Sequence, residues 1–286
     1  MFAEFELVMP GRLEEALRLL ADGKGGAVLA GGTNLMLDLR SRKDKPDRVI
    51  SICDLEELRG ISVDGDRITL GSRTTVTDLL RSSEVASFGP SLIDAAELFG
   101  GQMVRNTGTV GGNVACASPA ADLVPPLMSL DADLTLANAS GTRTVALSAY
   151  YQGYKSDVRK PDEIITQISW AKLPANSANT FYKLARRKGD AITVTGVAVT
   201  LVVTDGACTR ARIALGATGP TVMRARKAEA MLEGQVLTDE LVEAAAQQAA
   251  AESAPIDDLR AGAEYRVHTV HVLCRRLVSQ AWQKLV

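Results

Sequence analysis

Two glycine-rich segments place the tightest limits on how this chain can fold. The first, Gly31-Gly32, directly follows the short apolar stretch 27–30, and the second occupies residues 106–113. Glycine lets the backbone turn sharply and lets another group approach where a side chain would stand. Neither segment reads GxGxxG or GxxxxGK[ST], so the usual dinucleotide fold and the triphosphate loop are not indicated. A short strand running into a glycine pair favours an α/β domain at the start of the chain.

Both glycine segments also carry threonine and asparagine. Consecutive backbone N–H groups in such turns can converge on anionic oxygens. Two segments in one domain could therefore grip the phosphates of a dinucleotide from both sides, with added hydrogen bonds from Thr33, Asn34, Thr109 and Asn113. The alternative is that both are ordinary tight turns, which glycine pairs usually mark. The pattern favours an anionic ligand without naming it.

Length and charge exclude several classes of protein. The 286 residues suit one large domain or two ordinary ones. A net charge of −2 at pH 7 leaves no electrostatic footprint for nucleic acid or an anionic membrane. No stretch of about 18 uncharged apolar residues occurs, so we expect no membrane span. The acidic N-terminus does not resemble a secretory signal.

Residues that usually carry acid–base or metal chemistry are scarce. The four cysteines are widely separated: Cys53, Cys116, Cys208 and Cys274. An iron–sulfur or zinc site needs closely spaced thiolates, and scattered reduced thiols favour the cytoplasm. The only histidines, His268 and His271, have no third ligand near them in sequence, and we interpret them as packing or surface residues. If the chain is part of an enzyme, we therefore expect a cofactor to supply the reactivity.

Hydrophobic periodicity divides the chain into an α/β part and a C-terminal α+β part. Strands are expected at 5–8, 27–30, 48–52, 67–70, 134–136, 143–145, 194–203 and 211–216. Helices are expected at 11–21, 76–82, 91–99, 122–130, 225–233, 238–251 and 263–285. Residues 106–113 are expected to form a loop, and the small and polar residues of 171–180 indicate a linker between domains.

Three stretches of the sequence carry a family resemblance: AGGTNL, FGGQMVRNTGTVGGNVACASPAADLVPPLMSLDA and FYKLARRKGDAITV. With them the chain resembles the FAD-binding medium subunits of molybdenum hydroxylases, over nearly its whole length. The resemblance implies an α+β protein with the FAD-binding fold of the vanillyl-alcohol-oxidase (PCMH) type. Residues 1–173 would form that domain, with two α/β subdomains at about 1–55 and 56–173. Residues 177–286 would form a smaller C-terminal α+β domain.

The resemblance also implies roles for individual positions. Two segments would enclose the pyrophosphate of FAD, Asp122 would accept hydrogen bonds from the ribityl chain, and Lys183 would lie close to the flavin ring. The implied FAD-binding residues are Leu29, Ala30, Gly31, Gly32, Thr33, Asn34, Leu35, Phe99, Thr109, Val110, Gly111, Gly112, Asn113, Asp122, Ile165 and Lys183. No residue is expected to act as nucleophile or general base.

Several of these residues have a simpler interpretation. Phe99 ends a predicted helix and could simply be a core residue, and Ile165 by itself indicates only a buried strand. Asp122 could cap the helix that follows it. Lys183 begins a basic run with Arg186, Arg187 and Lys188, and such runs usually face solvent.

Electron relay is the function that the resemblance implies. A large molybdopterin-binding subunit would oxidise the substrate, and a small [2Fe–2S] subunit would pass the electrons through FAD to NAD or another acceptor, in a dimer of heterotrimers. Some relatives insert a cysteine-rich loop for an additional [4Fe–4S] cluster, but here Asn113 runs into Ala117-Ser118-Pro119 with Cys116 as the only cysteine between them, so no additional cluster is expected. The alternatives are a self-sufficient FAD-dependent oxidoreductase of the same superfold and a non-catalytic FAD-binding module.

Overall fold

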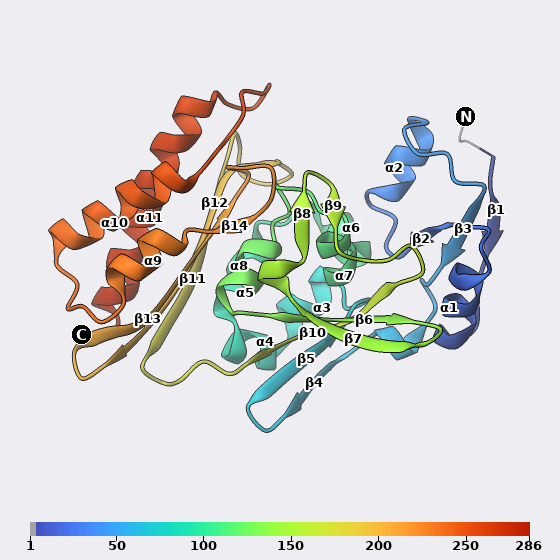
Figure 1. Cartoon of the computed structure of the whole chain (residues 1–286), viewed down its shortest axis with the longest axis horizontal. Helices are drawn as coiled ribbons and strands as arrows, with labels where there is room; N and C mark the ends of the chain where they lie inside the picture. Colours follow the sequence, from blue (N-terminus) through green and yellow to red (C-terminus); the bar gives the residue numbers. More distant parts are fainter. Residues whose placement is uncertain (1–3) are drawn as a thin grey trace.

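The computed structural model describes residues 4–286, so the first three residues of the expected N-terminal subdomain lie outside it. Three main sheets succeed one another from the N-terminal end of the molecule to the C-terminal helices (Figure 1). The first is parallel, in the order β1-β3-β2, with Val28 opposite Ile50. Its unit comprises β1 (Glu6–Val8), α1 (Leu13–Ala21), β2 (Ala27–Leu29), α2 (Leu35–Arg40) and β3 (Arg48–Ser51). The apolar face of α1, with Ala16, Leu17 and Leu20, packs on this sheet as its small core.

The central unit is built on a five-stranded antiparallel sheet in the order β4-β5-β10-β6-β7. Its strands are β4 (Ile61–Asp64), β5 (Arg67–Gly71), β6 (Asp133–Asn138), β7 (Gly141–Ala146) and β10 (Ile164–Ala171), with a small β8 (Tyr151–Gly153) and β9 (Ser156–Asp157) hairpin. Its helices are α3 (Val76–Arg81), α4 (Ser83–Phe88), α5 (Pro90–Glu97), α6 (Gln102–Thr107), α7 (Val110–Ala115) and α8 (Val124–Ser129), with short 3-10 turns η1 (Glu56–Leu58) and η2 (Leu147–Ala149). Trp170 is fully buried beneath them and donates to the carbonyl of Phe88 at 2.9 Å, which satisfies its indole N–H.

The C-terminal unit is a four-stranded antiparallel sheet covered by helices on both faces. Its elements are β11 (Ser177–Ala185), β12 (Thr193–Thr204), β13 (Ala207–Gly216), β14 (Met223–Arg224), α9 (Arg226–Leu232), α10 (Asp239–Glu252) and α11 (Ala263–Gln283). The three helices cover one face, while α5 and α8 of the central unit lie against the other (Figure 1). This double cover explains why every residue of β12 except its last is buried.

Most elements expected from the sequence are confirmed, with ends that agree to within two residues; β13 is longer and begins already at Ala207. Two expectations are wrong. Residues 106–113 are not one loop, because α6 ends at Thr107 and α7 begins at Val110. The proposed linker 171–180 is too long, because β11 begins at Ser177 and pairs with Val202. Its small polar residues are tolerated in a strand because cross-strand pairing to β12 determines their conformation.

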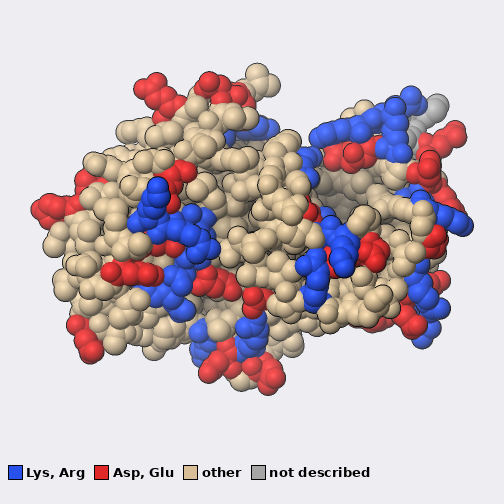
Figure 2. Space-filling model, viewed as in Figure 1, with Lys and Arg blue, Asp and Glu red and all other residues tan. Residues whose placement is uncertain are grey.

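The surface of the described residues carries no dominant charge on the face in view. Acidic and basic side chains alternate over all three units (Figure 2). Among the helices described, none has the length and apolar character needed to cross a membrane.

Candidate cofactor site

The first glycine segment turns the chain from β2 into α2. Gly32 has φ +71°, a left-handed conformation that favours glycine. Within residues 4–286, the backbone N–H groups of Gly31, Gly32, Thr33 and Asn34 donate to no acceptor. Four consecutive free donors at one turn form a site suited to anionic oxygens.

The second glycine segment uses its glycines differently. Thr109 caps α7, since its hydroxyl accepts from the N–H of Gly112 at 3.0 Å. The N–H of Gly111 donates to the carbonyl of Ser72 at 2.8 Å, and that of Val110 to the carbonyl of Thr74 at 2.9 Å. These amides are therefore engaged within the protein. A Cβ on Gly111 would lie 2.6 Å from the Cβ of Ser72, so glycine is needed here for close packing of α7 on the central unit.

The two segments meet each other. A Cβ on Gly31 would lie only 1.7 Å from the carbonyl oxygen of Thr107, so the first segment rests on the end of α6. The side-chain amide of Asn34 donates to the sulfur of Cys116 at 2.5 Å, three residues beyond the second segment. The side-chain oxygen of Asn113 accepts from the N–H of Leu123 at 3.1 Å, which ties the end of this region to α8. The fold thus brings together two segments that lie about 75 residues apart in sequence.

Asp122 and Lys183 form a buried ion pair between the central and C-terminal units. The Nζ of Lys183 lies 2.6 Å from Asp122 and also donates to the carbonyl of Leu98 at 3.2 Å. Thr193 donates its hydroxyl to the other oxygen of the carboxylate. Burial raises the pKa of Asp122 above its ordinary value, and Lys183 and Thr193 act against that rise.

These contacts decide between the interpretations left open by the sequence. The helix α8 has Leu123 as its N-cap residue and no side-chain cap, so Asp122 does not cap it. Lys183 is only 7% exposed, whereas Arg186, Arg187 and Lys188 are exposed. Lys183 therefore does not belong to a solvated basic face.

Phe99 and Ile165 both belong to the packing of the central unit. Phe99 is half-buried just after α5, and a Cβ on Gly108 would lie 3.4 Å from its ring. Ile165 is buried in β10 opposite Leu136, immediately before an irregularity in that strand. Leu29, Ala30 and Leu35 are half-buried around the first glycine segment.

Comparison with known proteins identifies the family of this chain. Residues 3–174 match the family model of the FAD binding domain in molybdopterin dehydrogenase, and residues 180–281 match that of the CO dehydrogenase flavoprotein C-terminal domain. The chain belongs to the FAD-binding subunits of molybdopterin dehydrogenases.

Relatives of known function span nearly the same length. The nicotinate dehydrogenase FAD-subunit of Eubacterium barkeri is 38% identical over 84% of this chain and 83% of its own. The carbon monoxide dehydrogenase medium chain of Hydrogenophaga pseudoflava is 31% identical over 98% of both chains.

Solved structures in the family agree with the fold described above. A chain of carbon monoxide dehydrogenase from Hydrogenophaga pseudoflava superposes with a TM-score of 0.96, at 32% identity and over the full length of both chains. A chain of quinoline 2-oxidoreductase from Pseudomonas putida 86 gives a TM-score of 0.92 at 27% identity, covering 100% of this chain and 99% of the other. The expected α+β class, with a PCMH-type FAD-binding domain and a C-terminal domain of the CO dehydrogenase flavoprotein type, is confirmed.

The residues of this FAD-subunit family member fit the cofactor that the family binds. Free amides from Gly31 to Asn34 suit a pyrophosphate, and the exposed Gly112 leaves room for a ligand to approach. A buried carboxylate beside a buried ammonium offers both an acceptor and a positive charge. No group of three or more histidine, cysteine or acidic side chains in the described range could hold a metal ion.

Two residues near this site, Thr193 and Arg159, were missed by the sequence reasoning. Thr193 binds Asp122, and Arg159 donates to the carbonyl of Ala115 at 3.2 Å, at the end of α7. Tyr151 donates to the neighbouring carbonyl of Val114 at 3.1 Å. All these contacts join segments more than 30 residues apart, so no local pattern could indicate them. Thr193 lies inside the quoted stretch FYKLARRKGDAITV, which was the only available signal for it.

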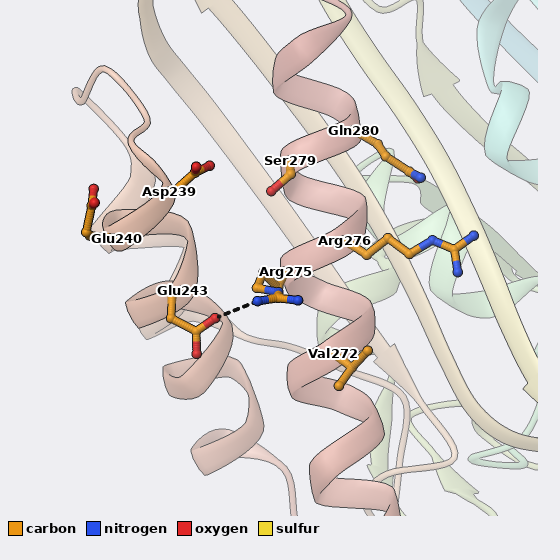
Figure 3. Close-up of a pocket in the computed structure, with 8 residues that line it drawn as sticks. All are labelled: Asp239, Glu240, Glu243, Val272, Arg275, Arg276, Ser279 and Gln280. Atoms are coloured by element: carbon orange, nitrogen blue, oxygen red, sulfur yellow. Dashed lines mark ion pairs between the residues drawn. The ribbon is translucent and has the colours of Figure 1, made fainter.

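A surface groove of about 710 Å³ lies elsewhere, between α10 and α11 of the C-terminal unit (Figure 3). Glu243 points toward Arg275 across it, 3.6 Å away, and also contacts His271 at 2.8 Å. His271 thus makes a hydrogen bond between α11 and α10 at the surface, in agreement with its interpretation as a packing or surface residue. The groove contains none of the expected FAD-binding residues.

Proposed function

We propose that this chain carries FAD as the flavin subunit of a molybdenum hydroxylase complex. Membership in a family of FAD subunits and medium chains supports this. Its partners in the proposal are a large molybdopterin-binding subunit and a small [2Fe–2S] subunit, in a dimer of heterotrimers. Electrons pass from that small subunit through this chain to NAD or another acceptor. Four free cysteines are consistent with the proposed cytoplasmic location.

We assign residues 1–173 to the FAD-binding domain and residues 177–286 to the C-terminal domain. Within the first, the subdomains are about 1–55 and 56–173. The change from one sheet to the next between β10 and β11 supports the main boundary, and the change between β3 and β4 supports the second.

The residues of this chain bind and position the cofactor. FAD supplies the redox chemistry, because its ring exchanges electrons one or two at a time. In the proposed site the amides of Gly31 to Asn34 donate to phosphate oxygens, and Thr109 and Asn113 approach from the other side. Asp122 would accept from a ribityl hydroxyl, and Lys183 would place a positive charge near the ring, which would favour its reduced, anionic form.

One observation carries this proposal: the four consecutive unpaired amides lie where the first glycine segment contacts the second. Unpaired backbone donors are uncommon when a segment is partly buried. Gly31 and Gly32 are both partly buried, so a ligand with anionic oxygens is the natural acceptor for their N–H groups.

The visible absorption spectrum of the purified full-length chain, mixed with FAD and then desalted, tests the proposal. Retained flavin bands near ~370 and ~450 nm are expected. Gly31→Ala should weaken FAD binding by about tenfold or more, because its Cβ would collide with the backbone of Thr107 and separate the two segments. The matched control is Gly153→Ala, since a Cβ there meets nothing within 4 Å.

The outcomes separate the proposal from its alternatives. A folded wild-type chain that never retains FAD would overturn it. Turnover of an organic substrate by the chain alone would favour a self-sufficient oxidoreductase. Bound flavin that no molybdenum or iron–sulfur partner reduces would favour a non-catalytic module.

A further inference from the structure

Helix α8 lies across one face of the C-terminal sheet. It contacts β11, β12 and β13. A Cβ on Gly216 of β13 would come within 2.8 Å of the Pro125 ring, so glycine lets the helix lie close to the sheet. Every residue of α8 is buried, which leaves the helix little freedom to move independently of the strands.

Polar contacts attach both ends of this helix to the same sheet. Just before α8, Asp122 binds Lys183 of β11 and Thr193 of β12. At its end, the hydroxyl of Ser129 accepts from Asn179 of β11 at 3.3 Å, and Asn179 also donates to Thr200 of β12 at 2.7 Å. Because α8 is short and attached at both ends, a displacement of one end must also displace the other.

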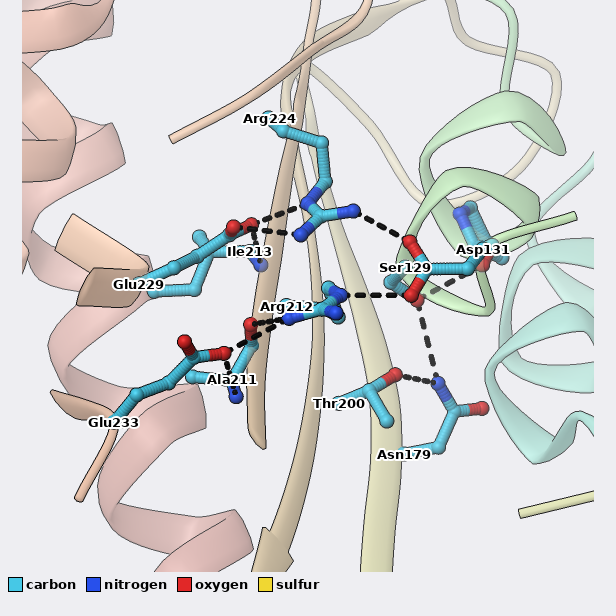
Figure 4. A network of polar contacts seen from close by, with 11 residues as sticks. Ser129, Asp131, Asn179, Thr200, Ala211, Arg212, Ile213, Arg224, Glu229 and Glu233 are labelled. Carbon is cyan, nitrogen blue, oxygen red and sulfur yellow. Dashed lines mark hydrogen bonds and ion pairs between the residues drawn. The ribbon is translucent and has the colours of Figure 1, made fainter. Parts of the chain in front are cut away.

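Asp131 is the centre of the second attachment. Its carboxylate accepts from Arg212 at 2.7 Å and from Arg224 at 2.6 Å, one oxygen for each guanidinium (Figure 4). Those arginines also bind Glu233 and Glu229 of the C-terminal unit, respectively. One carboxylate of the central unit thus receives two cations that are already fixed to the C-terminal unit.

Asp131 is the residue of this network that can be substituted with the least damage to the fold. Its φ is +51°, in the left-handed region that aspartate and asparagine tolerate better than most residues. Its side chain is 42% exposed, whereas that of Arg224 is 5% exposed. The carboxylate can therefore be changed with little harm to the core, while Arg224 and Glu229 form a buried pair whose disruption would be costly.

We propose that Asp131 is a positioning residue for the flavin site. By holding the end of α8 against Arg212 and Arg224, it keeps Asp122 in register with Lys183 and Thr193 at the beginning of the same helix. This inference rests on the proposed FAD site, in which Asp122 and Lys183 contact the cofactor. Asp131 itself does not touch the site.

Asp131→Asn tests the inference in the full-length chain, because it preserves size and the left-handed conformation but removes the charge and one of the two oxygens that accept from the arginines. Its matched control is Asp133→Asn, two residues away, whose carboxylate pairs with Arg67 at 2.5 Å within the central sheet. We expect Asp131→Asn to raise the Kd for FAD about threefold to tenfold and to make the flavin midpoint potential more negative. Asp133→Asn should change neither, even where both lower the unfolding midpoint equally.

A double-mutant cycle sharpens the test. Thr193→Val removes the hydroxyl that binds Asp122, far along the sheet from Asp131. If Asp131 acts through α8, the effects of the two changes on the Kd for FAD will not be additive, whereas unrelated sites add. Asp131→Asn and Asp133→Asn with the same Kd and potential as a wild type that binds FAD would overturn the inference. A wild type that binds no FAD would instead overturn the proposed function.

Discussion

A buried ion pair, Asp122 with Lys183, joins the central and C-terminal units, where apolar packing would be the more common contact. Removing two charges from water is costly, and apolar residues of similar volume often stabilise a protein equally well or better. The carboxylate accepts one hydrogen bond at each oxygen, from Lys183 and Thr193, which leaves lone pairs for a ligand. Such a pair is better explained by a ligand that needs both charges than by stability alone, which supports its place in the proposed flavin site.

A second carboxylate, Asp258, gives a pH-dependent prediction. Partial burial raises its pKa, but hydrogen bonds from the backbone of Arg260 and Ala261, then from the Arg260 and Arg266 side chains, outweigh this and lower the pKa to about 2. A carboxyl with a lowered pKa contributes stability above its unfolded pKa of about 4 and loses it as the pH falls through the folded value. Asp258→Asn should therefore reduce the free energy of unfolding by about 1 kcal/mol at pH 7.

Urea denaturation at pH 7 and near pH 2 measures this effect. The difference between wild type and Asp258→Asn should shrink between about pH 4 and pH 2, where the wild-type carboxylate takes up its proton. A difference that stays constant over that range would mean that the contacts of Asp258 do not depend on its charge.

Among the helices, α7 is where sequence and structure diverge most instructively. Its glycines predicted a loop, because glycine disfavours a helix by about 1 kcal/mol relative to alanine. Tertiary contacts override that preference: Gly111 packs on Ser72, and Tyr151 and Arg159 bind the last carbonyls. Longer periodic elements such as α11 were predictable from the sequence alone, since their apolar stripe extends over many turns.

The same limits apply to the site. The sequence could indicate the two glycine segments, because their composition is local. It could not indicate which backbone N–H groups are free, since that depends on distant acceptors. The carbonyls of Ser72 and Thr74 accept from the N–H groups of the second segment, whereas no carbonyl among the described residues accepts from residues 31–34 of the first. The family resemblance implied a separate role for Asp122 and for Lys183, but not the contact between them, because they lie 61 residues apart in sequence.

The cap of α7 gives a prediction about this element. Thr109→Ala removes the hydroxyl that accepts from Gly112 and should lower the free energy of unfolding by about 1 kcal/mol. It should also weaken FAD binding, because this cap lies within the second glycine segment and holds its helical part in place. Thr238→Ala is the control: Thr238 caps α10 in the same way, accepting from Leu241 at 3.2 Å, but lies in the C-terminal unit away from the glycine segments.

Chemical denaturation and FAD titration of both variants give the measurement. Similar losses of stability with a higher Kd for FAD in Thr109→Ala alone are expected. Equal Kd values in the two variants would show that the cap supports the fold without shaping the site.

The molecule as a whole consists of three units whose contacts converge on the proposed site. The N-terminal unit reaches it through Gly31, the central unit through α7 and Asp122, and the C-terminal unit through Lys183. Two of the apolar cores cross the boundaries between units: the central core includes Phe181 and Ala198 of the C-terminal unit, and the N-terminal core includes Ala137 and Ile164 of the central sheet. The relative position of the units therefore depends on close packing at these boundaries, and we expect the site to respond to changes there.

Gly216 gives the prediction that tests this dependence. In Gly216→Ala the new Cβ would lie 2.8 Å from the ring of Pro125, and neither α8 nor β13 can yield easily, since both are buried. We expect a loss of about 1 to 3 kcal/mol in the free energy of unfolding and weaker FAD binding, because α8 must move away from the sheet that carries Lys183. Gly196→Ala is the control: Gly196 pairs with Gly216 across the sheet, but its Cβ would meet the nearest atoms at an ordinary 3.4 Å. If Gly216→Ala lost stability yet bound FAD as tightly as Gly196→Ala, the distance between α8 and the sheet would matter for folding and not for the cofactor, and the cofactor would have to be held by the first two units alone.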